Sequence, residues 1–223
     1  MFVFYTNSQK MKKILLLLCL VFAIACNSNS TNEEVTKQTE EKILTKEEKL
    51  LKLYKESVIP LFKAYKDTSI PTVLKIDKKD FSINAGAAFG YIEISQGLVN
   101  LSKEHIQLFT LAHEVAHIII LQQAAIFNLG ESIPRGPKTN DYKKAEYLAD
   151  LTALSLIKTK IPKEFEVLLA DFPYLQNLLG ATTFTHPSGN DRIDSLTIFL
   201  ENSKLKGNND AFKQAYIKIW QMQ

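Results

Sequence analysis

The chain has 223 residues and a mass of 25.3 kDa, enough for one compact domain and too little for two large ones. With 46% hydrophobic and 23% charged residues, its composition excludes a disordered chain, a collagen-like repeat and a disulfide-rich scaffold. The net charge of +3 belongs to residues 1–25, which hold three lysines and no acid; of the 27 Lys and Arg, 24 remain against 24 Asp and Glu. This neutral remainder argues against a protein that binds nucleic acid through bulk charge.

Residues 1–25 have the pattern of a secretory signal peptide, with Met11 as the more natural start. Two lysines precede an apolar run, which ends in the small-residue sequence AIA directly before Cys26. The run is shorter than the ~20 residues that a membrane-spanning helix needs. We therefore expect the chain to be exported, with its mature form beginning at Cys26.

The sequence around Cys26 resembles a bacterial lipoprotein box, which implies a diacylglycerol anchor on the Cys26 thiol. The alternative is an ordinary cleaved signal that leaves a free thiol, a liability in an oxidising compartment. Residues 27–44 are polar and predict a flexible tether between the anchor and the domain. Asn27, directly after the anchor, slightly favours the outer membrane. The expected location is the cell envelope, with the domain facing the periplasm.

Residues 45–223 are predicted to form a single domain that begins with a helix. Thr45 and Glu48 fit a capping box, and the helix is expected to run to about Lys66, with a kink or a break at Pro60. Strands are predicted from apolar and β-branched residues at 72–76, 81–83 and 89–95.

The rest of the chain predicts helices and one long loop. Glycines and prolines over residues 126–139 indicate the loop. The helices are expected from Ser102 to about Gln123, from Asn140 or Asp141 to about Lys158, in short pieces after Pro162, from Asn190 or Asp191 to about Glu201, and from Asn209 or Asp210 to about Gln221. This order of elements predicts a mainly helical α+β fold.

The predicted helix that contains residues 108–123 carries the motif HExxH, formed by His113, Glu114 and His117. Residues four apart share a face of a helix, so both imidazoles can bind one metal ion. Glu114 lies about 100° around the helix and can reach a water molecule beside the metal. The segment is otherwise apolar, and unpaired polar groups in a core cost several kcal/mol. Two core histidines satisfied by hydrogen bonds are the alternative.

A catalytic zinc ion takes three protein ligands and keeps one position for water. The longer motif HExxHxxGxxH is excluded, because Ile120 and Gln123 stand at its glycine and its third histidine. Glu146, on the next predicted helix, is the better candidate for the third ligand. Asp150 lies one turn further on the same face, and the two form the gluzincin arrangement, in which the aspartate accepts a hydrogen bond from a histidine ligand. The alternative, a solvated helix face, is disfavoured by the apolar neighbours.

Four blocks of sequence, in this order, resemble the HtpX-like zinc metallopeptidases, a gluzincin family that includes the CAAX prenyl endopeptidase. The blocks are Asn84-Ala85 with residues 90–99, His113 to His117, Glu146 to Asp150, and Thr185-His186-Pro187 with Arg192, Ile193 and Leu196. The chain departs from the family at Ala116, where glycine is common, and at residues 87–89, where Pro-Gly-Gly is common. The resemblance implies a zincin-like fold, a small sheet whose edge strand borders the active-site helix, and one Zn²⁺ per chain on His113, His117 and Glu146.

The resemblance also implies roles for other side chains. Glu114 is expected to act as general base and then general acid, and His186 either stabilises the oxyanion or approaches the metal as a fourth, inhibitory ligand. Arg192 is expected to pair with a buried acid such as Asp150, the alternative being a surface charge. The strand at 89–95 is expected to be the sheet edge on which an extended substrate lies, through Gly90, Tyr91, Ile92, Glu93 and Ile94.

Together these expectations describe a zinc-dependent endopeptidase of the bacterial envelope that cleaves misfolded or specific envelope proteins. Its expected partners are protein or peptide substrates and the membrane, reached through the lipid on Cys26, with no nucleic acid. A metal-binding chaperone or assembly factor with latent or secondary proteolysis is the alternative. A structural lipoprotein without metal is a third hypothesis.

Overall fold

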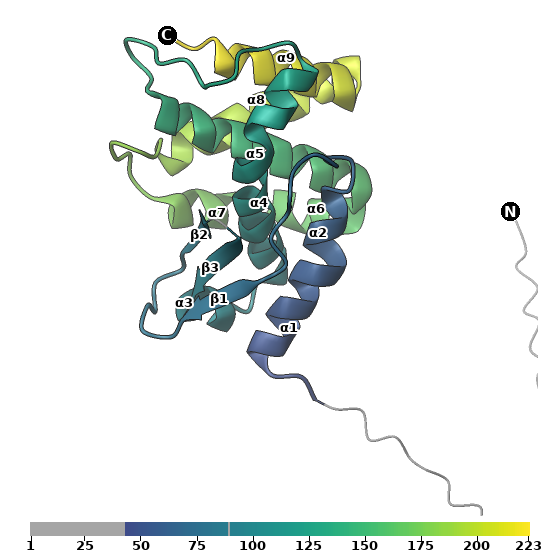
Figure 1. The fold of residues 1–223 in the computed structure, drawn as a ribbon, viewed down its shortest axis with the longest axis vertical. Coiled ribbons are helices and arrows are strands. Elements are labelled where there is room, and N and C mark those ends of the chain that lie inside the picture. The colour runs from purple at the N-terminus through teal and green to yellow at the C-terminus, as the bar shows by residue number, and fades with distance from the viewer. Residues whose placement is uncertain (1–42, 89) are drawn as a thin grey trace, which may run out of the picture. The chain divides into compact units, whose positions relative to one another are not determined.

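The computed structural model of the protein describes residues 43–88 and 90–223. The predicted signal peptide, the lipid on Cys26 and most of the predicted tether lie outside the described residues. Within them the chain is mainly helical and has a three-stranded mixed sheet, which confirms the predicted α+β class. The sheet and the first helix lie at one end of the domain and the last two helices at the other, with two long helices between them (Figure 1).

The first helical segment begins as predicted and ends early. It consists of α1 (Lys46–Leu53), the π-helical turn η1 (Tyr54–Val58) and α2 (Ile59–Leu61). The capping box is complete: the Thr45 hydroxyl accepts a hydrogen bond from the Glu48 N–H, and the Glu48 carboxylate accepts one from the Thr45 N–H. Pro60 has no N–H and its ring crowds the preceding turn. The preceding turn is the π-helical turn η1, where the predicted break appears, and the chain continues as a helix through Pro60 and ends at Leu61, short of the predicted Lys66.

Three strands form the sheet: β1 (Leu74–Asp77), β2 (Ala85–Ala88) and β3 (Tyr91–Ser95). The predicted strands at 72–76 and 89–95 correspond to β1 and β3, but the prediction of a strand at 81–83 is wrong. There the Asp80 carboxylate accepts hydrogen bonds from the N–H and the hydroxyl of Ser82, which makes a turn. Strand β2 was not predicted, because it consists of alanine and glycine, which are depleted in strands.

The order of the strands is β1-β3-β2, with β3 parallel to β1 and antiparallel to β2. The expectation that residues 90–94 form the substrate edge is therefore wrong, since β3 is the middle strand. Strand β2 is the edge that contacts the helix with the HExxH motif, α4 (Glu104–Ile126). A sheet edge does border this helix, but a different strand supplies it.

The remaining helices are α3 (Gln96–Asn100), α5 (Asp141–Lys160), α6 (Pro162–Ala170), α7 (Phe172–Leu179), α8 (Gly189–Lys206) and α9 (Asn208–Trp220). Asn140 caps α5 as predicted. Ser188, and not Asn190 or Asp191, caps α8, and its hydroxyl accepts a hydrogen bond from the Asp191 N–H. The loop predicted at 126–139 is confirmed between α4 and α5.

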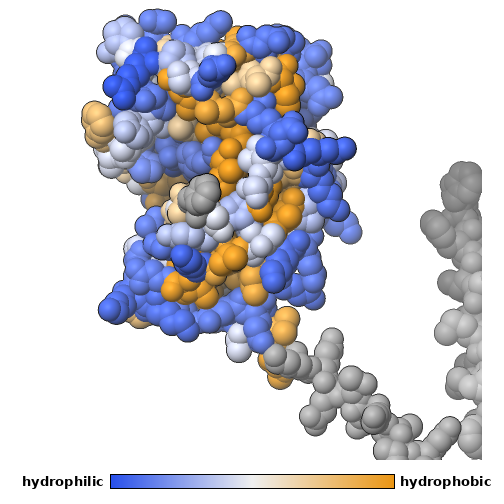
Figure 2. Space-filling model, viewed as in Figure 1, coloured by the Kyte–Doolittle hydropathy of each residue, from blue (hydrophilic) through white to orange (hydrophobic). Residues whose placement is uncertain are grey.

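Helices α4 and α5 form the centre of the domain and contact each other more extensively than any other pair of elements in the described part of the chain. By length and composition α4 is able to cross a membrane, but 61% of the stretch concerned is buried inside the domain, and a core helix has the same properties. On the face in Figure 2, apolar residues form a broken band within a mainly hydrophilic surface. The packing of α4 on α5 holds the side chains between them in fixed positions.

Candidate metal centre

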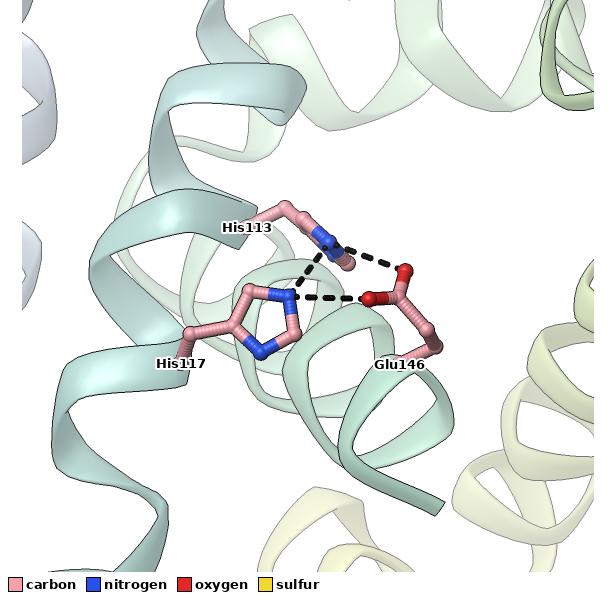
Figure 3. A group of neighbouring side chains, drawn as sticks. All are labelled: His113, His117 and Glu146. Carbon is pink, nitrogen blue, oxygen red and sulfur yellow. Dashed lines mark hydrogen bonds and ion pairs between the residues drawn. The ribbon is translucent and has the colours of Figure 1, made fainter. Parts of the chain in front are cut away.

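Three candidate ligands meet where α4 packs on α5. His113 and His117 project from one face of α4 and point toward Glu146 of α5 (Figure 3). The two Nε2 atoms lie 2.9 Å apart. Glu146 Oε2 lies 3.4 Å from Nε2 of His113, and Oε1 lies 3.3 Å from Nε2 of His117. One ligand atom from each residue therefore falls within 4.8 Å of the others.

This donor set fits a metal ion that prefers nitrogen and oxygen. Ligands about 2.0–2.1 Å from a tetrahedral zinc ion lie about 3.3 Å apart, and both distances from Glu146 to the histidines agree with that spacing. The shorter distance between the two imidazoles is that of a hydrogen bond between them. Because His113 is 6% exposed and Glu146 8%, the group is buried, and this buried group can hold a metal ion.

Asp150 fixes the orientation of His113. Its Oδ1 atom lies 2.9 Å from Nδ1 of the imidazole, so Nε2 is directed at the other ligands. Burial lowers the pKa of His113, but the charge and the hydrogen bond of Asp150 outweigh burial and raise the pKa to about 10. A metal ion bound at Nε2 would therefore have to displace a proton. Burial by itself raises the pKa of Glu146. Hydrogen bonds from His113 and His117 outweigh burial and hold the pKa of this carboxyl well below its usual range.

Arg192 of α8 completes the polar cluster, and its predicted pairing with a buried acid is confirmed. Its Nε and Nη2 atoms donate to the two oxygens of Asp150 at 2.6 and 2.7 Å. Nη1 lies 3.1 Å from Oε2 of Glu146. Arg192 is 5% exposed and Asp150 1% exposed, so α8 is joined to α5 by a buried ion pair and not by a surface charge.

Glu114, the predicted base, lines the same cavity as the three candidate ligands. This cavity has a volume of about 460 Å³ and lies between α4, α5, α7 and β2. Glu114 is 7% exposed and forms no hydrogen bond within the described residues. Its carboxylate is thus free to accept a proton from a molecule that enters the cavity.

His186 lies on the loop between α7 and α8 and also reaches the site. Its Nε2 atom is 3.6 Å from Oε1 of Glu146, and its Nδ1 atom is 2.7 Å from the hydroxyl of Thr185. The side chain is 51% exposed, in contrast to the buried ligands. The loop therefore presents one imidazole nitrogen at the mouth of the site, within reach of the carboxylate oxygen that faces His117.

The edge strand β2 offers backbone groups to the cavity. Backbone groups alternate between the two sides of a strand, and the Asn84 carbonyl accepts from the N–H of Ser95 in β3. In this register Ala85 and Ala87 direct their N–H and C=O groups away from β3. Both residues line the cavity, and within the described residues no strand pairs with this side of β2.

Two further features of the site were missed by sequence reasoning. Leu175, Leu178 and Leu179 of α7 also line the cavity and make part of its lining apolar. A second cavity of about 850 Å³ shares Ala87 and His117 with the first and is lined mainly by the polar loop that precedes β1. The site therefore lies between the leucines of α7 and the loop that precedes β1. Nothing in the local sequence of α7 or of that loop indicates this, since tertiary packing brings them together.

Comparison of the chain with protein-family models, with curated proteins and with solved structures finds no match. A proposal about function therefore rests on the site and on the sequence patterns, and not on a matched relative.

Proposed function

We propose that this domain is a zinc-dependent endopeptidase of the zincin type. One observation carries the proposal: His113, His117 and Glu146 converge on one point, and Glu114 lies beside them in a cavity along the free side of β2. Two imidazoles and a carboxylate on a buried pair of helices are the ligand set of many catalytic zinc sites. The sequence resemblance to the HtpX-like metallopeptidases, which rests partly on these same residues, supports the same class.

A bound zinc ion would supply Lewis-acid activation of water and of the scissile carbonyl. The chain's own residues then have separate tasks. Glu114 takes the proton of the attacking water on its carboxylate and passes it to the leaving amine. The N–H and C=O groups of Ala85 and Ala87 hold an extended peptide by adding it to the sheet as a further strand. His186 either donates a hydrogen bond to the developing oxyanion or closes the site at rest as a fourth ligand.

The predicted export of the chain would place this activity in the cell envelope. A lipid on Cys26 would anchor the domain to the envelope, with residues 27–44 as a tether, and the substrates would be misfolded or specific envelope proteins. A chaperone or assembly factor that binds metal and cleaves slowly or not at all is the alternative.

Glu114→Gln tests the proposal, because the amide keeps the shape of the side chain and cannot accept the proton. We expect the variant to bind one zinc ion per chain and to lose cleavage of casein by about 10²- to 10⁴-fold. Glu104→Gln is the matched control, since Glu104 is an exposed carboxylate in the first turn of the same helix. It should leave both zinc content and cleavage unchanged.

Full cleavage by Glu114→Gln would show that Glu114 is not the base. Zinc-loaded wild-type protein that prevents aggregation of an unfolded protein but cleaves none would favour the chaperone alternative. Less than about a tenth of a metal equivalent in protein purified without chelator would contradict both and favour a structural lipoprotein.

A further inference from the structure

Arg192 touches both acids that α5 directs into the polar cluster. Glu146 and Asp150 lie one turn apart on that helix, and the guanidinium lies against both of them. Its two bonds to Asp150 are short and parallel, which fixes the plane of the guanidinium. Nη1, the nitrogen that does not bond to Asp150, is therefore held 3.1 Å from Oε2 of Glu146.

The two oxygens of Glu146 have different surroundings. Oε1 faces imidazoles only, 3.3 Å from Nε2 of His117 and 3.6 Å from Nε2 of His186. Oε2 lies 3.4 Å from Nε2 of His113 but is also in contact with Arg192. Both oxygens are thus close enough to an imidazole to bind the same metal ion. Carboxylates bind metals through one oxygen or through both. The identity of the three ligand residues alone therefore does not determine the coordination number.

We propose that Arg192 is a positioning residue that keeps Glu146 a ligand through one oxygen. By holding Oε2, the guanidinium leaves Oε1 for the metal ion and keeps a coordination position open. A catalytic zinc site needs that position for water and substrate. The inference rests on the proposed function only in requiring a metal ion on His113, His117 and Glu146.

The burial and the shape of the guanidinium make this restraint effective. For Oε2 to turn toward the metal, Glu146 has to give up a charge-assisted contact with a guanidinium that is only 5% exposed. Arg192 cannot follow the moving oxygen, because Asp150 holds the other two nitrogens. Lysine has a single ammonium on a flexible stem and cannot occupy Asp150 and Oε2 in the same rigid way.

The test is the coordination number of the bound metal in Arg192→Met and Arg192→Lys, measured by X-ray absorption on zinc-loaded protein. We expect the number of nitrogen and oxygen ligands to rise by about one in both variants. In cobalt(II)-loaded protein the visible absorption should weaken, as it does when cobalt gains a ligand. Cleavage of casein should fall about 10- to 100-fold.

Arg135→Met is the matched control. Arg135 is the other arginine of the chain, and it pairs with Asp141 at 3.2 Å with its side chain 74% exposed. Its variant should keep the wild-type spectrum and activity. Wild-type protein by itself also decides the question if the Arg192 variants do not fold: two oxygens of one carboxylate in its zinc shell would overturn the inference. An unchanged coordination number in folded Arg192→Met would overturn it as well. A wild-type spectrum in Arg192→Lys would show that a positive charge is sufficient, and would contradict the role given to the rigid guanidinium.

The spectra separate this inference from the proposed function. If the wild type binds one metal ion and cleaves no peptide, the proposed function fails while the ligand count still decides the role of Arg192. If the wild type takes up no metal, both are wrong.

Discussion

Helix α4 carries two histidine–aspartate pairs, and only one of them belongs to a candidate metal centre. Near its start, Nε2 of His105 lies 2.8 Å from Oδ2 of Asp171, between α6 and α7. Two turns later, Nδ1 of His113 lies 2.9 Å from Oδ1 of Asp150. The two pairs have nearly the same length, and each joins α4 to a neighbouring segment of the chain.

The difference lies in which ring nitrogen the aspartate takes. Asp150 binds Nδ1 of His113 and leaves Nε2 directed at His117 and Glu146. Asp171 binds Nε2 of His105 itself, and its other partner is a lysine, Lys103, at 2.7 Å. The group of candidate ligands found in the described residues does not include His105. A histidine beside an acid can thus be a structural contact alone, and a metal site also requires a free ring nitrogen that converges with other donors.

Replacing the two histidines in turn should give the largest contrast. His113→Ala removes one of the three candidate ligands, and we expect its metal content to fall to background, together with its cleavage of casein. His105→Ala should bind as much metal as the wild type, because it removes only a contact with Asp171. Metal analysis of both proteins, purified side by side without chelator, checks this. Metal retained by His113→Ala and lost by His105→Ala would reverse the comparison.

Replacing the two aspartates should give a smaller contrast. Asp150→Asn removes the negative charge and one of the two acceptor oxygens that hold His113 and Arg192, and changes of this kind weaken metal binding about 10- to 100-fold. Asp171→Asn should leave the affinity unchanged. Competition with a chelator of known affinity measures both. Since Asp150→Asn also removes one of the two charged partners of the buried Arg192 and leaves only Glu146, the free energy of unfolding should fall, by up to about 3–5 kcal/mol. Equal metal affinities in the two variants would show that Asp150 does not orient the ligand.

This contrast also shows how far the sequence could lead. The spacing of His113 and His117 follows from the period of a helix, which is a local property, and so does the spacing of Glu146 and Asp150 on the next predicted helix. Which strand forms the sheet edge depends on pairing between segments that are not adjacent, and β2 consists of small residues without a strand pattern. The sequence therefore predicted an edge beside α4 and assigned it to the wrong strand.

The partners of the remaining polar residues lie far along the chain. Asp171 is 66 residues from His105, and Arg192 is 42 residues from Asp150. For Arg192 the family blocks supplied a hint that a buried acid is its partner. For His105 no motif did, and its spacing from His113 gives no sign of which ring nitrogen is used.

The smallest expected effect concerns the pH dependence of the structural pair. Hydrogen bonds from Lys103 and from His105 lower the pKa of Asp171 below its usual range. A carboxyl with a lowered pKa stabilises the fold above the pKa of the unfolded chain, about 3.9 for aspartate, and this stabilisation is lost as the pH falls through the folded-state value. In metal-free protein, Asp171→Asn should therefore lose less stability than the wild type on acidification. Urea unfolding from about pH 7 down to about pH 3 measures this difference.

Because the Asp171 side chain is 24% exposed, water and salt weaken the contact, and high salt should reduce the difference between the two proteins. If the two proteins lose the same free energy of unfolding on acidification at low salt, the His105–Asp171 pair does not stabilise the fold. The contrast with His113–Asp150 would then rest on metal binding alone.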